Sequence, residues 1–144
     1  MRITVQARTM TASYLVDTDW VIHWFNNHEP IQRRLEALRS QGLALSAVSL
    51  AELWEGVHYS RNPQESERGL YEFLRLVSLL GVDEETCKLF GRERGRLRAE
   101  GKRVGDFDLL IGVTAIQHDL TLLTNNRRHF ENVQGLRIES LLSQ

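Results

Sequence analysis

Three acidic residues have the type and position that suit metal-assisted chemistry on phosphates. Asp17 directly follows a short apolar run at 14–16, which suits a strand buried on both faces. Glu52 lies one turn into the helix expected after a second strand, and Asp108 lies in the first turn of a helix that leads into a further strand. Because open parallel sheets bind ligands beyond the carboxyl ends of their strands, we expect these three carboxylates to converge.

A cluster of this kind has a defined chemistry. Converging carboxylates repel one another, and a folded protein tolerates them when a cation lies among them. Ligation by oxygen alone, without His or Cys, selects Mg²⁺ or Mn²⁺ over zinc. Such ions polarise phosphoryl oxygens and help to generate hydroxide from water. Asp106 and Asn126 are placed to join the same cluster.

Each acid also has a purely structural interpretation, which the sequence leaves open. Asp17 and Asp106 suit helix N-caps. Glu52 lies three residues after Ser49, which is the spacing of a capping box. Asp108 is an acid in the first turn of a helix, where the helix dipole favours negative charge.

The positions of these acids depend on an alternation of short strands and amphipathic helices. Strands are expected at 14–16, 43–46, 120–124 and 136–138. Helices are expected at 20–25, 30–41, 48–59, 63–80 (with a short strand at its end, 77–80), 84–100 and 106–116, with a loop or helical turn at 127–130. This order predicts an α/β fold, a three-layer α/β/α sandwich around a central, mostly parallel sheet of four to five strands.

The bulk properties of the chain limit the remaining choices. The length of 144 residues suits one domain, at 14–144, after a loose or extended leader at 1–13, and Met10 is an alternative to Met1 as the natural start. The single cysteine, Cys87, excludes a disulfide within the chain and is expected to be an inert core thiol. No apolar run reaches membrane-spanning length, so we expect a cytoplasmic protein with no membrane partner.

Basic side chains are concentrated in two short stretches. The formal net charge of −1 excludes nucleic-acid binding by bulk charge, so such a role needs a local patch. The predicted helix at 84–100 is either a solvated face or a patch that contacts phosphates. The candidate contacts in and beyond this helix are Arg92, Arg96, Arg103, Arg127 and Arg128.

Four motifs resemble, in order and spacing, those of the PIN domain. They are the stretches 15–19 (LVDTD), 49–53 (SLAEL), 105–112 (GDFDLLIG) and 123–126 (LTNN), the last followed by Phe130. More narrowly, the chain is similar to VapC-type toxins of bacterial toxin–antitoxin pairs. The resemblance extends from about residue 14 to residue 142.

The resemblance implies an Mg²⁺-dependent endoribonuclease, with Mn²⁺ as a substitute ion, that cleaves RNA such as tRNA. It implies that Asp17, Glu52 and Asp108 hold the metal and activate water, while Thr18 and Thr124 orient the carboxylates. Asn126 stands where the family has a fourth acid, which puts a second metal in doubt.

The same resemblance implies two protein partners. One is a small VapB-type antitoxin that neutralises the toxin, and the other is a second copy of the chain in a homodimer. An apolar groove for an antitoxin helix is expected on the face near Trp20, Trp24 and Trp54.

Two alternatives to a nuclease remain at this point. A phosphatase of the haloacid-dehalogenase type would use Asp17 as its nucleophile, although Glu52 would then have no role. A non-catalytic PIN module would bind RNA or protein and would have little affinity for Mg²⁺ or Mn²⁺.

Overall fold

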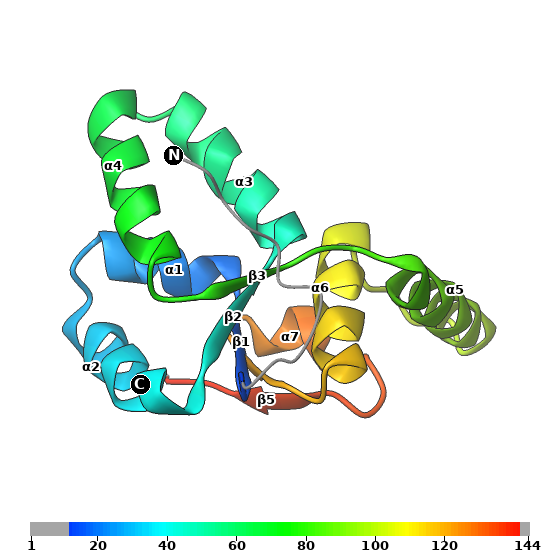
Figure 1. The fold of residues 1–144 in the computed structure, drawn as a ribbon. Helices are drawn as coiled ribbons and strands as arrows, with labels where there is room; N and C mark the ends of the chain where they lie inside the picture. The colour runs from blue at the N-terminus through cyan, green and yellow to red at the C-terminus, as the bar shows by residue number, and fades with distance from the viewer. Residues whose placement is uncertain (1–11, 142–144) are drawn as a thin grey trace.

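The computed structural model describes residues 12–141 and is built around one five-stranded sheet (Figure 1). The strands are β1 (Tyr14–Val16), β2 (Leu43–Ser46), β3 (Ser78–Leu80), β4 (Thr121–Leu123) and β5 (Arg137–Glu139). They lie in the order β3-β2-β1-β4-β5, and every pairing is parallel. The carboxyl ends of all five strands therefore meet at one edge, with β1 at the centre. The predicted fold class is confirmed.

The short strands divide their apolar side chains between two cores. Leu15 of β1 and Leu122 of β4 pack in the cluster on one face of the sheet, whereas Val16 and Leu123 pack in the cluster on the other. Successive side chains of a strand point to opposite faces, so a sheet covered on both sides needs an apolar residue at every position. This requirement explains the uninterrupted apolar runs in the sequence.

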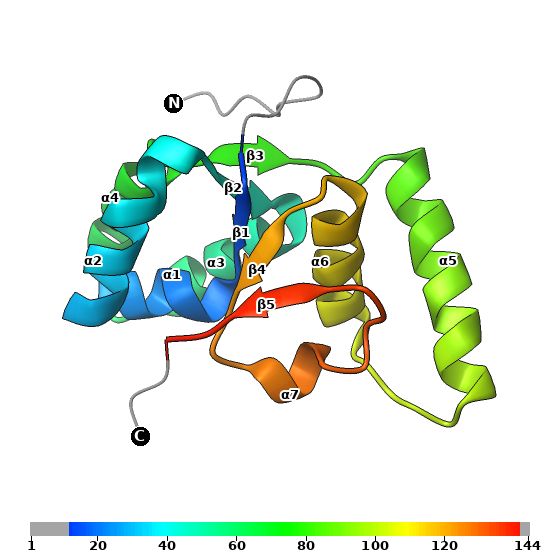
Figure 2. The same cartoon turned by 90° about the horizontal axis from the view of Figure 1, so that it is seen from below.

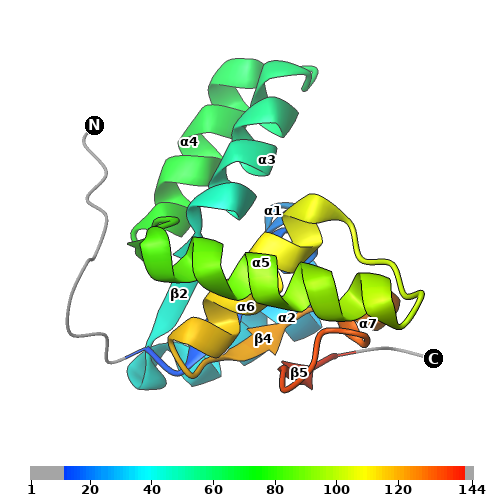
Figure 3. The ribbon, with the colours of Figure 1, turned by 90° about the vertical axis from the view of Figure 1, so that its right-hand side faces the viewer.

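Helices cover both faces of the sheet (Figure 2). They are α1 (Thr18–Phe25), α2 (Glu29–Leu38) with a 3₁₀ turn at Arg39–Gln41, α3 (Ala47–His58), α4 (Pro63–Leu74), α5 (Glu84–Ala99), α6 (Asp106–Gln117) and α7 (Arg127–Phe130). The helices α1 to α4 bury their apolar faces in one core, and α6 and α7 bury theirs in the other. The pair α3 and α4 projects beyond the sheet (Figure 3).

The helix α5 packs on α6 rather than on the sheet. Leu97 of α5 is fully buried in a third apolar cluster with Leu109 and Val113 of α6. The rest of α5 is largely polar, and it begins with a capping box in which Asp83 and Thr86 bond to each other's backbone N–H. This helix is therefore an outer layer, held by one stripe of contacts.

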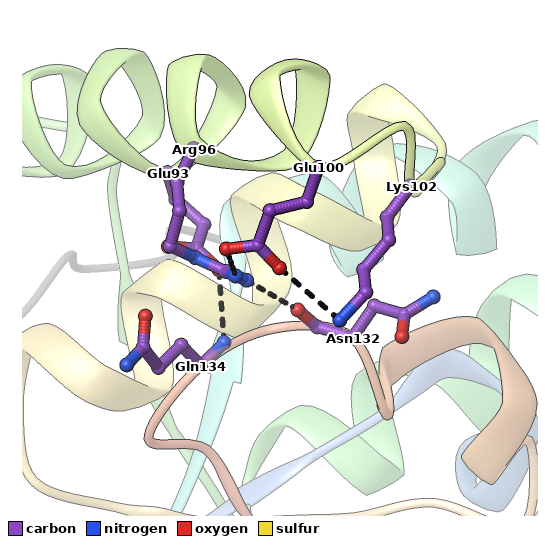
Figure 4. A network of polar contacts seen from close by, with 6 residues as sticks. All are labelled: Glu93, Arg96, Glu100, Lys102, Asn132 and Gln134. Atoms are coloured by element: carbon purple, nitrogen blue, oxygen red, sulfur yellow. Dashed lines mark hydrogen bonds and ion pairs between the residues drawn. The ribbon is translucent and has the colours of Figure 1, made fainter.

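A polar network fastens the last turns of α5 to the connection between α7 and β5 (Figure 4). Arg96 donates to the carboxylates of Glu93 at 2.6 Å and Glu100 at 2.9 Å, and to the backbone oxygen of Asn132 at 2.7 Å. Glu93 also accepts from the backbone N–H of Gln134 at 2.8 Å. Because both carboxylates stabilise the charged guanidinium, the pKa of Arg96 is raised above its ordinary value.

Two predicted features of the chain are wrong in detail. The helix expected at 63–80 ends at Leu74, and the strand at its end is the separate element β3. Cys87 is exposed on α5 rather than buried in the core, because α5 buries only a narrow stripe. Residues 1–11 of the expected leader lie outside the described residues. Within residues 12–141, no helix is long and apolar enough to cross a membrane.

The capping box expected at the start of α3 is also wrong. Ser46 caps the helix instead, since its hydroxyl accepts from the backbone N–H of Val48 at 3.0 Å. The hydroxyl of Ser49 is buried without a hydrogen-bond partner among the described residues. Glu52 is therefore free of the helix terminus, and its carboxylate is available for another contact.

Candidate active site at the carboxyl edge of the sheet

Asp17 occupies the centre of this edge, immediately after β1. Its side chain is only 4% exposed. One carboxylate oxygen accepts from the backbone N–H of Thr18 at 2.8 Å, so Asp17 caps α1, and the other accepts from the hydroxyl of Thr124 at 2.7 Å. Burial raises the pKa of Asp17 to about 7, and the negative charge of Asp19 contributes to the rise. The structural and the chemical interpretations of Asp17 are thus compatible.

Asp19 joins the site through the residues that follow β4. Its carboxylate accepts from the hydroxyl of Thr124 at 3.2 Å and from the backbone N–H of Asn125 at 3.0 Å. The hydroxyl of Thr124 therefore lies between two carboxylates that come from the start of α1. Asp19 was not among the predicted site residues, although its position two residues after Asp17 was a signal that could have placed it here.

Glu52 reaches the site across the α1–α3 interface. Its carboxylate accepts from the hydroxyl of Thr18 at 2.7 Å. Thr18 is the residue whose backbone N–H bonds Asp17, so one threonine joins two of the three predicted acids. Thr18 and Thr124 were predicted to orient the carboxylates, and their hydroxyls do donate to Glu52 and Asp17.

Asp108, in the first turn of α6, makes no hydrogen bond to this group within the described residues. Its carboxylate is 3.4 Å from the Nδ1 atom of His129 on α7. Partial burial raises the pKa of Asp108, and a protonated His129 would oppose that rise. No spacing in the sequence predicts that the exposed ring of His129 lies beside this acid.

The expected convergence of all three carboxylates is only partly correct. Asp17 and Glu52 are linked through Thr18, but Asp108 makes its contact with α7 instead. Within residues 12–141, no three His, Cys, Asp or Glu side chains are arranged so that they could hold a metal ion. The sheet topology brings β1, α3 and α6, which position the three acids, to one edge. The direction of each carboxylate then depends on the hydroxyl or imidazole group that it contacts.

The remaining auxiliary candidates point elsewhere. Asp106 is exposed and pairs with Arg94 of α5 at 2.7 Å, and Gly105 rather than Asp106 is the N-cap of α6. Asn126 is exposed, and its backbone N–H donates to the hydroxyl of Thr124 at 3.0 Å. Asn126 thus touches the site through its backbone.

Its neighbour Asn125 has the larger structural role. Its side-chain oxygen accepts from the indole N–H of Trp20 and from the backbone N–H of Leu141, each at 2.9 Å. Its backbone N–H bonds Asp19. Asn125 therefore connects the core, the site and the segment after β5, a role that the sequence did not reveal.

The five arginines predicted to contact RNA have different surroundings. Arg96 is held in the network of Figure 4, so its guanidinium is already occupied. Arg127 donates to the hydroxyl of Ser140 at 3.1 Å. Arg92, Arg103 and Arg128 are exposed and make no side-chain hydrogen bond or ion pair within the described residues. These three remain available to a ligand.

The donors at this edge match Mg²⁺ in chemical type. Asp17 and Asp19 offer carboxylate oxygens on one turn of backbone, and no basic side chain pairs with either in the described part of the chain. A divalent cation would supply the missing positive charge, and oxygen is the donor that Mg²⁺ prefers. The fit is therefore one of charge and donor type, and gathering Glu52 and Asp108 onto the same ion would require their side chains to turn.

Comparisons with known proteins agree on one family. The family model of the PIN domain matches residues 14–136. Ribonuclease VapC2 of Rickettsia felis is 30% identical over 129 residues, which cover 88% of this chain and 96% of that protein. The tRNA(fMet)-specific endonuclease VapC of Shigella flexneri is 31% identical over 126 residues, with 88% and 96% covered.

Solved structures give the same answer. VapBC2 of Rickettsia felis bound to a promoter DNA fragment superimposes with a TM-score of 0.85 at 29% identity, covering 90% of this chain and 98% of that one. DNA-bound VapBC of Salmonella typhimurium gives 0.84 at the same identity and coverage. The chain therefore belongs to the PIN domain family and, within it, to the VapC ribonucleases.

Proposed function

We propose that this protein is the ribonuclease toxin of a VapBC pair, and that it cleaves RNA with the help of Mg²⁺. The observation that carries the proposal is the buried Asp17 carboxylate at the centre of the strand-end edge, hydrogen bonded by Thr124 and beside Asp19. Membership of the VapC group supports the RNA substrate. The phosphatase alternative receives no support, because the matched family is another one.

Each side chain of the site has a proposed role in the cleavage reaction. Mg²⁺, when bound, would stabilise the charge that develops on the phosphate and make water a better nucleophile. Asp17 would be its principal ligand, with Glu52 and Asp108 as further proposed ligands. Thr18 and Thr124 fix the carboxylate of Asp17 through the backbone N–H at 2.8 Å and the hydroxyl at 2.7 Å. The carboxylate oxygen of Glu52 that Thr18 does not bond would accept a proton from the attacking water.

Removal of divalent ions tests the chemistry directly. We expect the full chain to cut RNA in Mg²⁺ or Mn²⁺, and we expect excess EDTA to abolish the cutting. Mixed cellular RNA with sequencing of the new ends would also show whether tRNA is the preferred target, as the name of the Shigella flexneri relative suggests. Full activity in EDTA, or no metal binding in calorimetry, would instead favour metal-free chemistry or the non-catalytic module.

We place the antitoxin on the face formed by α1, α3 and α4. A mainly apolar hollow of about 330 Å³ there is lined by Ile22, Phe25, Leu53, Val57 and, at one side, the catalytic candidate Glu52. A segment bound in this hollow would therefore touch the site. The expected location is corrected in part, because Trp20 is fully buried, whereas Trp24 lines an adjoining hollow.

A charge placed at Ile22 should separate toxin from antitoxin. The side chain of Ile22 is 46% exposed, so Ile22→Lys leaves the core intact while putting an ammonium into the apolar hollow. We expect a loss of affinity of at least about 100-fold in co-purification and calorimetry, the scale of an interface hot spot. Val82→Lys, at a similarly exposed apolar residue elsewhere, is the matched control. Equal antitoxin affinity for both variants would contradict the proposal that the antitoxin binds this face.

The homodimer that the family resemblance implies remains a proposal. Sedimentation of the purified chain, alone and with its antitoxin, would test it. A monomer at all concentrations in both samples would contradict it.

A further inference from the structure

A basic hollow lies where α5 meets the start of α6. It has a volume of about 710 Å³ and is formed by the end of α5, the connection at 100–105 and the first residue of α6. Four cationic side chains and one carboxylate line it: Arg94, Arg98, Lys102, Arg103 and Asp106. An anion is therefore the ligand that its charge favours.

The cations of this hollow are not equally free. Arg94 is held by Asp106 at 2.7 Å and by the backbone oxygen of Val104 at 2.9 Å, so it shapes the wall. Lys102 pairs with Glu100 at 3.2 Å (Figure 4). The side chains of Arg98 and Arg103 are exposed and make no hydrogen bond or ion pair within residues 12–141. These two guanidinium groups provide the uncompensated positive charge.

An exposed aromatic residue follows the hollow directly in the sequence, in the first turn of α6. Phe107 lies between Asp106, which lines the hollow, and Asp108, and its side chain is 53% exposed. Gly105, which lines the hollow, is so close to Asp108 that a Cβ atom there would lie 3.6 Å from a carboxylate oxygen of that acid. The hollow, the ring and the acid are therefore adjacent along one short stretch of chain.

We propose that this stretch binds unpaired RNA next to the bond that is cut, with a backbone phosphate in the hollow against Arg98 and Arg103 and a neighbouring base stacked on Phe107. The inference rests on the proposed ribonuclease function and assigns the contacts with unpaired RNA to Arg98, Arg103 and Phe107. Bases in a duplex are already stacked and cannot be offered to a ring in this way. A basic groove beside an aromatic platform is the combination by which single strands are held without a sequence code. An apolar protein segment would fit less well, because the residues before and after Phe107 are both acidic and the hollow beside them is basic.

Binding in EDTA separates this inference from catalysis, because neither contact requires a metal. Fluorescence anisotropy of the full chain with a labelled single-stranded oligoribonucleotide should show saturable binding. We expect Phe107→Ala to weaken RNA binding about 5- to 100-fold without changing the salt dependence of the affinity. Phe107→Tyr keeps an aromatic ring and should retain the affinity of the unaltered protein. Arg98→Gln with Arg103→Gln should weaken binding and reduce the slope of log affinity against log salt by about 0.7, for the loss of one neutralised phosphate.

Matched controls identify the cause of each effect. Tyr59→Ala removes another exposed aromatic ring, and Arg61→Gln with Arg68→Gln removes two other exposed arginines. Both should bind RNA like the unaltered protein. Phe107→Leu keeps the apolar character without a ring, so full affinity in that variant would exclude stacking.

Other outcomes overturn the inference in distinguishable ways. If the unaltered protein cuts RNA in Mg²⁺ but Phe107→Ala binds RNA unchanged and loses antitoxin affinity, the ring belongs to a protein interface and only this inference fails. Equal affinity for a duplex and a single strand would also overturn it. If the unaltered protein neither binds nor cuts RNA, the proposed function itself is wrong.

Discussion

Asp17→Asn is expected to abolish RNA cleavage and to raise the thermal stability of the protein. The amide keeps the shape of the carboxylate, and its oxygen can still accept from the backbone N–H of Thr18 that Asp17 caps at 2.8 Å. Its nitrogen can donate to the oxygen of Thr124, whose hydroxyl is then free to bond Asp19. Only the negative charge is lost. We expect activity to fall about a thousand-fold or more, the scale seen when a central catalytic group is removed.

The gain in stability has a separate physical cause. Burial and the charge of Asp19 raise the pKa of Asp17 to about 7, so the folded protein favours the neutral form. As pH rises from 3.8 to about 7, the carboxyl ionises in the unfolded chain while it stays largely protonated in the folded protein. The free energy of unfolding therefore falls as pH rises through this range. Without divalent ions at pH 8, the amide should stabilise the fold by about 1–2 kcal/mol, or roughly 3–8 °C in Tm.

Calorimetric unfolding at pH 8 and pH 5 in EDTA, together with cleavage assays in Mg²⁺, would test both halves of this prediction. The stability advantage of Asp17→Asn should be smaller at pH 5, where the wild-type carboxyl is largely protonated. Asp119→Asn is the matched control, because that carboxylate is exposed and pairs with Arg137 at the other end of β4. An active Asp17→Asn protein would remove Asp17 from the mechanism.

Trp20→Ala is expected to have the largest effect on folding. Trp20 is a fully buried side chain in the core between α1 and the sheet, and its indole N–H bonds Asn125 at 2.9 Å. Truncation would leave a large cavity and cost about 3–5 kcal/mol. That is a large part of the 5–15 kcal/mol by which domains are typically stable, so Tm should fall by roughly 10–20 °C.

Two further variants interpret the effect of Trp20→Ala: one separates packing from hydrogen bonding, and the other is a control at a second tryptophan. Trp20→Phe keeps much of the apolar volume but removes the donor to Asn125, and should cost about 1–2 kcal/mol. Trp54→Ala removes a half-buried ring that packs edge-on against Tyr71, and should cost less than Trp20→Ala. Chemical unfolding of the three variants gives the comparison. Equal losses for Trp20→Ala and Trp54→Ala would contradict the central position of Trp20.

The sequence predicted the positions of elements better than the directions of side chains. Apolar runs that end in polar residues correctly placed Asp17 and Thr124 at the carboxyl ends of β1 and β4. The same reasoning could not foresee that Glu52 would accept from Thr18, or that Asp108 would face His129. These contacts depend on angles between helices that share no local sequence, so periodicity contains no information about them.

Other errors have local causes. Ser46 and Ser49 both suit an N-cap, and the choice depends on where β2 releases the chain. Phe107 was not considered as a contact residue, because an aromatic residue next to an apolar helix resembles core. Its exposure follows from α5, which covers α6 on the side of Leu97 and leaves the first turn of α6 open.

The outer position of α5 has a consequence for how such nucleases diverge. This helix is held by its contacts with α6 and by the polar network around Arg96, and it does not pack on the sheet. Its solvent-facing residues can therefore be replaced with little effect on the fold. A lineage could thus exchange the charges that surround its substrate while the strand-end acids stay fixed. Target choice and cutting chemistry would then evolve at separate speeds within one small domain.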